Sequence, residues 1–152
     1  EGARRNSIFR AHMIANSLKH APPLSLFQGF ALIRSGEHRN TLDLKLSGVV
    51  PIVDLARVYA LDGGIEEVNT RERLIAARDA GSLSEAGAGD LADAYDLISR
   101  IRLQHQARQV RDGKKPDNFM APATLSALER KHLKDAFGVV KSMQAALRSR
   151  SA

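Results

Sequence analysis

The sequence contains no cysteine and few aromatic residues, which make up 5% of the chain. The lack of cysteine excludes disulfides and thiolate metal sites, and it is compatible with the reducing cytoplasm, where we expect the protein to be located. No apolar run approaches the ~20 residues needed to span a bilayer, and the start shows no signal-peptide pattern. We therefore expect a cytoplasmic chain without a membrane partner, whose core is built from Leu, Ile, Val and Ala.

Sequence patterns of metal and phosphate chemistry are also missing. The five histidines show neither the H-x-x-x-H nor the H-x-x-E-H spacing of a metal site. No G-x-x-x-x-G-K-[ST] phosphate loop occurs. We therefore predict no catalytic residue, no metal site and no cofactor within this chain.

The charge balance is basic, with a formal net charge of +6 over 152 residues. A basic balance favours acidic partners such as nucleotides or phosphates, although a solvated surface with some excess lysine and arginine is the simpler interpretation. The basic residues are spread along the chain without the clustered stripe of a nucleic-acid binder, so we do not expect a nucleic-acid partner. The length suits one domain over 1–152, and the non-methionine start leads us to expect the C-terminal fragment of a longer chain.

Helical periodicity and capping residues recur along most of the chain. Apolar residues at helical spacing predict a first helix over 4–20, ended by Pro22-Pro23, and a second from Pro51 to the Asp62-Gly63-Gly64 stop. Capping residues predict three more helices, starting at Asn69, at Ser82 or Ser84, and at Ser126. Together these features predict an all-α, up-and-down bundle of about five helices with one small β-hairpin insertion.

The predicted hairpin lies between the first two helices. Thr41, Asp43 and Lys45 alternate with Leu42, Leu44 and Leu46, which places the leucines on one face of a strand. Residues 30–33 are the expected partner strand, joined by a turn in which Gly36 can adopt positive φ. The hairpin therefore gathers several charged side chains into one short span.

Motifs spread over about 22–147 carry a family resemblance. They are R-S-G-E-H from Arg34, L-D-L-K from Leu42, P-I-V-D-L-A-R from Pro51, N-T-R-E-R-L from Asn69, I-R-L-Q-H-Q from Ile101, P-D-N from Pro116 and L-S-A-L-E-R-K-H-L-K-D-A-F from Leu125. The chain resembles the nucleotidyltransferase substrate-binding domain. In that family, this is the C-terminal helical domain of bacterial signal-transduction proteins that also carry CBS or cyclic-nucleotide-binding domains and are similar to protein-PII uridylyltransferase.

The resemblance implies a non-catalytic substrate-binding and regulatory module beside an upstream nucleotidyltransferase domain. The partner substrate would be a nucleotide or an acceptor, either a protein or a small molecule. The Gly-Ser motif and paired aspartates of a catalytic domain do not occur in this chain, so the parent chain would supply them together with a nucleoside triphosphate and magnesium. The family pattern often has a second arginine where this chain has Gln104, which argues against a strongly anionic ligand at that position.

The fourth predicted helix continues an apolar stripe into polar residues. Arg102, His105 and Gln109 follow the stripe formed by Leu91, Ala94, Tyr95, Ile98 and Ile101. Polar groups on a core stripe need partners or an open cavity, so they are candidates for a site at one end of the bundle. A loop that crosses the bundle end and hydrogen-bonds to them is the structural alternative.

The charged hairpin residues form a second candidate. Arg34 and Lys45 are suited to phosphate, while Glu37 and His38 can position a ligand or pair with basic neighbours. Turn chemistry and surface ion pairs are the simpler alternative, and Asp54 with Arg57 is expected to pair structurally. We predict one cleft, in which the hairpin reaches Arg102 or His105. The predicted substrate-binding residues are Arg34, Glu37, His38, Lys45, Arg102 and His105.

Two other functions remain open. Arg100 and His105 match the R-x4-6-H motif of HEPN-type helical ribonucleases. On a continuous helix these two residues lie about 140° apart, which argues against a shared site. The other alternative is a ligand-free dimerisation module, possible as a homodimer, which an exposed apolar seam would favour.

Overall fold

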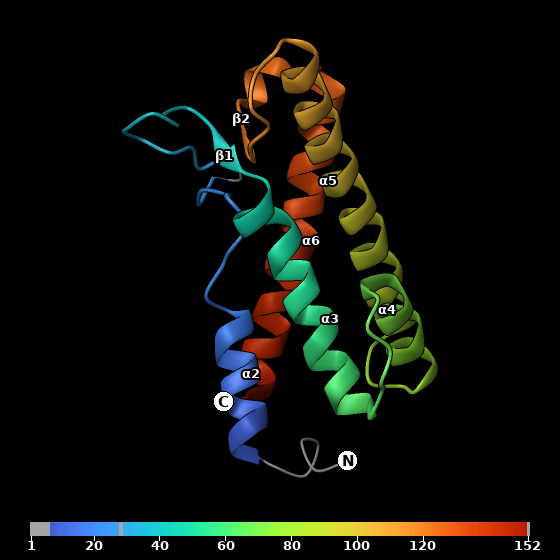
Figure 1. The fold of residues 1–152 in the computed structure, drawn as a ribbon. Helices are drawn as coiled ribbons and strands as arrows, with labels where there is room; N and C mark the ends of the chain where they lie inside the picture. Colours follow the sequence, from blue (N-terminus) through green and yellow to red (C-terminus); the bar gives the residue numbers. More distant parts are fainter. Residues whose placement is uncertain (1–6, 28, 152) are drawn as a thin grey trace.

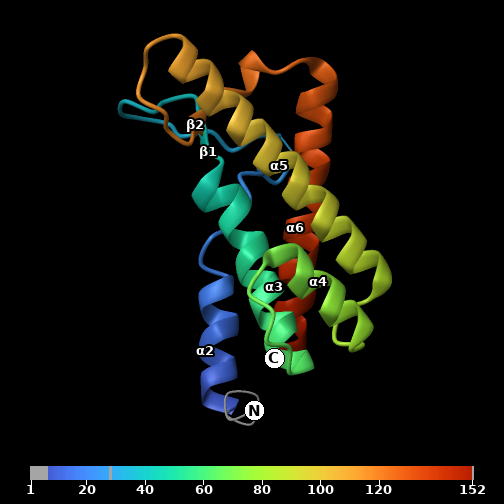
Figure 2. The same ribbon diagram turned by 45° about the vertical axis from the view of Figure 1, so that its right-hand side comes forward.

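The computed structural model describes residues 7–27 and 29–151. Within these residues the chain forms a bundle of five helices: α2 (Ser7–Ser17), α3 (Val50–Gly63), α4 (Thr70–Asp79), α5 (Glu85–Arg111) and α6 (Ala127–Ser151) (Figure 1). The long helices α5 and α6 pack against each other, and α3 contacts α2, α4 and α6 (Figure 2). The predicted all-α fold class is confirmed. No described helix is long and apolar enough to cross a membrane.

The helix boundaries follow the local signals in the sequence. Pro51 lies in the first turn of α3, and Gly64 ends that helix in the left-handed conformation with φ of 69°. Asn69 caps α4 by accepting hydrogen bonds from two backbone N–H groups, and Ser84 caps α5 in the same way through the N–H of Gly87. Ser126 and Glu129 form a reciprocal capping box at the start of α6. The predicted caps are therefore confirmed, and part of the first predicted helix, 4–6, lies outside the described residues.

A small antiparallel sheet joins two distant segments. β1 (Leu42–Asp43) pairs with β2 (Phe119–Met120), so that Leu42 lies opposite Met120. The predicted pairing of this strand with residues 30–33 is therefore wrong. Ile33 nevertheless exchanges backbone hydrogen bonds with Asn40 and Thr41, so the chain does turn back on itself where a turn was expected.

The predicted strand is also shorter than expected, because a π-helix follows β1. This element, η1, covers Lys45–Val49 and leads directly into α3. Leu42 and Leu44 are buried as predicted, but Leu46 is turned outward and is 46% exposed. Gly48 lies in close contact with α5 and α6, since a Cβ at this position would be 2.8 Å from Cγ2 of Ile98.

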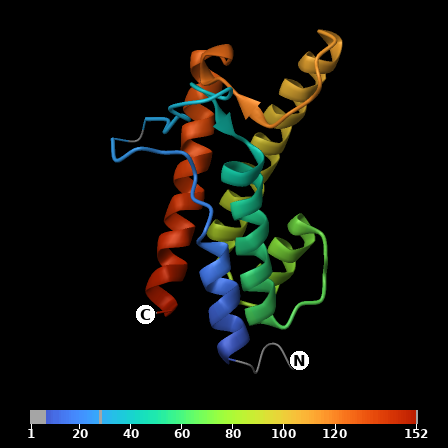
Figure 3. The same cartoon turned by 60° about the vertical axis from the view of Figure 1, so that its left-hand side comes forward.

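The core between the helices consists mainly of aliphatic side chains, together with the buried aromatic residues Phe137 and Tyr59. Phe137 of α6 is fully buried, and its ring meets the ring of Phe30 edge to face at 6.2 Å. Other fully buried side chains come from the residue just before η1 and from the helices α3 to α6. They include Leu44, Ile52, Leu55, Leu74, Leu91, Ile98, Leu133 and Leu147. The segment between α2 and β1 passes alongside α6 (Figure 3) and covers this part of the core.

Candidate functional site

The C-terminal half of α5 changes from an apolar to a polar face as it leaves the core. Ile98 and Ile101 are buried, whereas Arg102, His105 and Gln109 are partly exposed. All five positions follow the three- and four-residue spacing of one helical face. The helix therefore delivers a basic group, an imidazole and an amide to one end of the bundle, as the sequence predicted.

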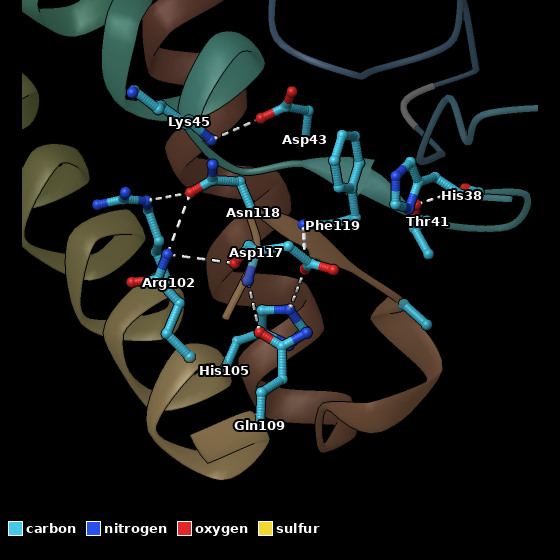
Figure 4. Close-up of polar contacts among 12 residues, drawn as sticks. His38, Thr41, Asp43, Lys45, Arg102, His105, Gln109, Asp117, Asn118 and Phe119 are labelled. Atoms are coloured by element: carbon cyan, nitrogen blue, oxygen red, sulfur yellow. Dashed lines mark hydrogen bonds and ion pairs between the residues drawn. The ribbon is translucent and has the colours of Figure 1, made fainter. Parts of the chain in front are cut away.

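The segment that leads into β2 supplies the partners of these side chains. Arg102 Nε donates to Asn118 Oδ1 at 2.6 Å, and His105 Nε2 lies 3.1 Å from Asp117 Oδ1 (Figure 4). Gln109 Oε1 accepts a hydrogen bond from the backbone N–H of Asp117 at 2.9 Å. The polar face of α5 is thus held against residues 117–118 rather than against the hairpin.

Two further contacts complete the network. Gln106 Nε2 donates to the carbonyl of Asp117 and to Asn118 Oδ1, at 3.2 and 3.3 Å. The N–H of Phe119 donates to Asp117 Oδ1 at 3.0 Å. We call this network the polar junction; its side chains are those of Arg102, His105, Gln106, Gln109, Asp117 and Asn118. Among the described residues no buried side-chain nitrogen or oxygen lacks a partner, so the buried polar atoms of the junction are all paired within the protein.

The predicted hairpin reaches the polar junction indirectly. The ring of His38 stacks on Phe119 with centroids 3.5 Å apart and planes at 6°, and the N–H of Leu44 donates to the carbonyl of Asn118 at 2.9 Å. In the part of the chain that the structure describes, no hydrogen bond or ion pair joins a hairpin side chain to Arg102 or His105. The expected direct contact is therefore not formed, although both candidate segments do meet at the same end of the bundle.

The remaining predicted site residues lie at different distances from the junction. Arg34 and Glu37 are exposed on the turn that extends away from the helices, as Figure 1 shows for this segment. Lys45 is exposed at the start of η1, where its N–H donates to Asp43 Oδ1 at 3.0 Å. Asp54 and Arg57 form the expected ion pair at 3.2 Å. The structure therefore connects His38, Arg102 and His105 through residues 117–119 and leaves Arg34, Glu37 and Lys45 at the periphery.

Asp117 and Asn118 were not among the predicted site residues. Their signal was present, because a polar stripe on α5 requires polar partners and this pair ends the loop that leads from α5 to β2. The loop alternative considered for Arg102 and His105 is the arrangement that the structure shows. From the sequence alone, the predicted hairpin was preferred over this loop as the partner of Arg102 and His105, because the hairpin holds more charged residues.

The carboxylate of Asp117 is electrostatically stabilised within the junction. Partial burial would raise its pKa, but hydrogen bonds from His105, Gln109 and the Phe119 N–H, together with the nearby imidazole, lower that pKa below its ordinary value. The carboxylate therefore stays ionised in the folded protein at pH values where the unfolded chain already takes up protons.

This lowered pKa predicts a specific acid sensitivity. Asp117→Asn should reduce the free energy of unfolding at pH 7 by roughly 1 kcal/mol, since the carboxylate's hydrogen bonds are weakened. Because the pKa of Asp117 is lower in the folded than in the unfolded protein, the ionised carboxylate stabilises the fold at pH values above its unfolded pKa. This stabilisation is lost as the pH falls through the folded pKa. The difference in unfolding free energy between wild type and Asp117→Asn should therefore shrink below about pH 4. Urea unfolding at pH 7 and pH 3 measures both differences.

The matched control for that experiment is Asp112→Asn, which removes an exposed carboxylate from the end of α5. We expect this variant to unfold like the wild type at both pH values. An Asp117→Asn deficit that stays constant or grows at pH 3 would contradict the assigned role of the carboxylate.

The geometry does not support the ribonuclease motif on α5. Arg100 is exposed, whereas the side chain of His105 is 15% exposed and lies against Asp117. In the described residues no group of three or more His, Cys, Asp or Glu side chains is arranged to hold a metal ion. What the junction offers is a set of hydrogen-bonding and charged side chains, among them Arg102 and the His105–Asp117 pair.

The fold is an all-α helical bundle whose polar end is closed by a two-stranded sheet. Residues 7–151 match the family described as "Putative nucleotidyltransferase substrate binding domain", and the chain belongs to this family. Neither the comparison with curated proteins nor that with solved structures returned a match. The family match covers every element described above and agrees with the resemblance carried by the sequence motifs.

Proposed function

We propose that this chain is the non-catalytic substrate-binding and regulatory module of a signal-transduction nucleotidyltransferase. The observation that carries the proposal is the family match over residues 7–151. In this proposal an upstream domain of a cytoplasmic, bacterial, PII-uridylyltransferase-like protein with CBS domains performs the chemistry with a nucleoside triphosphate and magnesium. The helical module then holds the substrate, a nucleotide or an acceptor, beside that domain.

The polar junction and the adjoining turn segment, residues 33–45, are the proposed substrate surface. Arg102 uses Nε in its one hydrogen bond within the described residues, so its Nη groups are free to donate to an anionic or carbonyl-bearing substrate. His38 stacks on Phe119 and so places a second imidazole beside the polar junction. Arg34, Glu37 and Lys45 lie further out and would contact a larger acceptor, while Arg102, His105 and His38 would contact its reacting end.

A turnover assay tests the non-catalytic assignment. The isolated chain, incubated with nucleoside triphosphates, magnesium and candidate acceptors, or separately with RNA, should form no product above the buffer blank. Chromatography of the nucleotides and gel analysis of the RNA measure this. Turnover that survives repurification and disappears in His105→Ala would overturn the assignment and favour the ribonuclease alternative.

The substrate surface itself is tested by an acceptor screen that uses Arg102→Gln. Binding of a proteinaceous or small-molecule acceptor, measured by isothermal titration calorimetry, should weaken about tenfold because a charge-assisted hydrogen bond is lost. Arg148→Gln, an exposed arginine near the far end of α6, is the matched control and should leave affinity unchanged. Equal affinities for wild type and Arg102→Gln would remove the junction from the substrate surface.

A further inference from the structure

A concave surface lies away from the polar junction, between the segment after α2 and the outer face of α6. The hollow has a volume of about 570 Å³. Its lining includes three lysines and two serines: Lys131, Lys134, Lys141, Ser25 and Ser142. We call it the lysine hollow. Its volume falls within the ~300–1,000 Å³ of pockets that bind small molecules.

The spacing of residues on α6 creates both the charge and the space. Lys131, Lys134 and Lys141 share a helical face with the small residues Gly138 and Ala145, at intervals of three and four. A Cβ at Gly138 would meet nothing within 4 Å, so the floor of the hollow is open there. The helix therefore places ammonium groups around a floor of small residues.

The opposite wall is fixed in place by contacts with the same helix. Gln144 Nε2 donates to the carbonyl of His20 at 2.7 Å, and the ring of Phe30 packs edge to face on Phe137. Lys134 Nζ lies 5.0 Å from the centre of the Phe30 ring, a cation–π contact that ties one of the lining lysines to this wall. Figure 3 shows this segment, which comes after α2, running beside α6. Of the lining residues in this segment, Leu24 also packs against the core, so this part of the wall is already in place when a ligand binds.

The chemistry of the lining selects a particular kind of ligand. The three ammonium groups outnumber the single carboxylate of Asp135, and the two serine hydroxyls add neutral hydrogen-bond donors. Such a set suits the oxygens of phosphate groups. Leu24 and Leu26 supply an apolar wall against which a flat ring can pack, and Asp135 can accept hydrogen bonds from sugar hydroxyls.

We propose that the lysine hollow binds a nucleoside phosphate, with the phosphates at the lysines and the base against the leucines. The choice of a nucleotide as ligand rests on the proposed function, in which a nucleotide is one of the substrates. The position of the site rests only on the residues that line the hollow. The polar junction is then left for the acceptor. Nucleotide and acceptor would occupy separate surfaces of one module.

Calorimetric titration of the 152-residue chain with ATP, and in parallel with GTP, CTP and UTP, tests the proposal. The double variant Lys131→Gln/Lys141→Gln should raise the dissociation constant about tenfold or more, because each lost charge-assisted contact weakens phosphate binding. Lys114→Gln/Lys115→Gln is the matched control, since it removes the same charge from exposed loop residues that do not line the hollow. The control should bind like the wild type at moderate ionic strength.

A second variant pair tests the space rather than the charge. Gly138→Leu fills the open floor without changing charge, and leucine is the better helix former, so the fold should persist while nucleotide binding is lost. Gly89→Leu on α5, where a Cβ also meets nothing within 4 Å, should bind normally. Circular dichroism and thermal unfolding confirm that all variants are folded.

The assignment would be overturned by no nucleotide binding by the wild type, by equal weakening in the two lysine pairs, or by normal binding in Gly138→Leu. Loss of nucleotide binding in Arg102→Gln alone would move the nucleotide to the polar junction, which refutes the hollow and preserves the proposed function. Adenosine and tripolyphosphate are titrated as partial ligands, and ATP should bind more tightly than either. If tripolyphosphate binds as tightly as ATP, the hollow is a general polyanion site and nucleotide recognition is refuted.

Discussion

Replacing Phe137 with alanine should lower the free energy of unfolding by about 3–5 kcal/mol, the usual range for removing a fully buried aromatic side chain. The ring is fully buried and joins three parts of the fold: its own helix, Phe30 in the segment after α2, and Gly48 in η1. The loss combines the transfer of the ring to water with the cavity that it leaves. Urea or guanidinium unfolding followed by circular dichroism measures this change.

Phe27→Ala provides the matched control for that experiment. Phe27 is 96% exposed, so the same chemical change should alter the free energy of unfolding by less than about 0.5 kcal/mol. If the two variants have similar stabilities, Phe137 is not part of the core. Phe137→Ala also removes the edge-to-face partner of Phe30, so the wall of the lysine hollow should become more mobile in the folded variant.

Gly48→Ala should destabilise the protein by about 1–3 kcal/mol, although it adds only one methyl group. The new Cβ would lie 2.8 Å from Cγ2 of Ile98 and 3.7 Å from Cε1 of Phe137. Ile98 cannot easily move this methyl group, because a β-branched side chain on a helix is nearly restricted to one χ1 rotamer. Thermal and chemical unfolding should both report the loss.

Two comparisons isolate the steric cause. Gly89→Ala, on α5 where a Cβ meets nothing within 4 Å, should instead stabilise the protein by about 0.5–1 kcal/mol through helix propensity. The double variant Gly48→Ala/Ile98→Leu removes the clashing Cγ2, so it should be more stable than the sum of the two single changes predicts. Strict additivity would show that Gly48 is not constrained by Ile98.

Local sequence signals accounted for the helices of this fold but not for its sheet. Asn69, Ser84 and Ser126 cap helices because their side chains reach N–H groups two or three residues away, an interaction that neighbouring residues specify. The pairing of Leu42 with Met120 depends on how the whole bundle brings two short segments together. Leu46 was misplaced for a related reason, since an alternating pattern does not reveal that the backbone enters a π-helix at Lys45.

The candidate site was predictable to a similar extent. The apolar-to-polar change along α5 correctly indicated that Arg102 and His105 need polar partners at one end of the bundle. It did not indicate which segment supplies them, because Asp117 and the charged hairpin residues are equally suitable in chemistry and differ only in position. The hollow on α6 was not predicted, since its second wall comes from a segment more than a hundred residues earlier in the chain.

The pairing of β1 with β2 also has a consequence for the order of folding. The strands can meet only after α3, α4 and α5 have brought positions 42 and 120 together, so closing this long loop costs entropy that the local helices do not have to overcome. We therefore expect the polar junction to be assembled late in folding. It also rests on two-residue strands, so its amide groups should exchange with solvent before those of α3 and α6. We therefore expect the end of the bundle that carries Arg102 and His105 to open locally while the rest of the molecule stays folded.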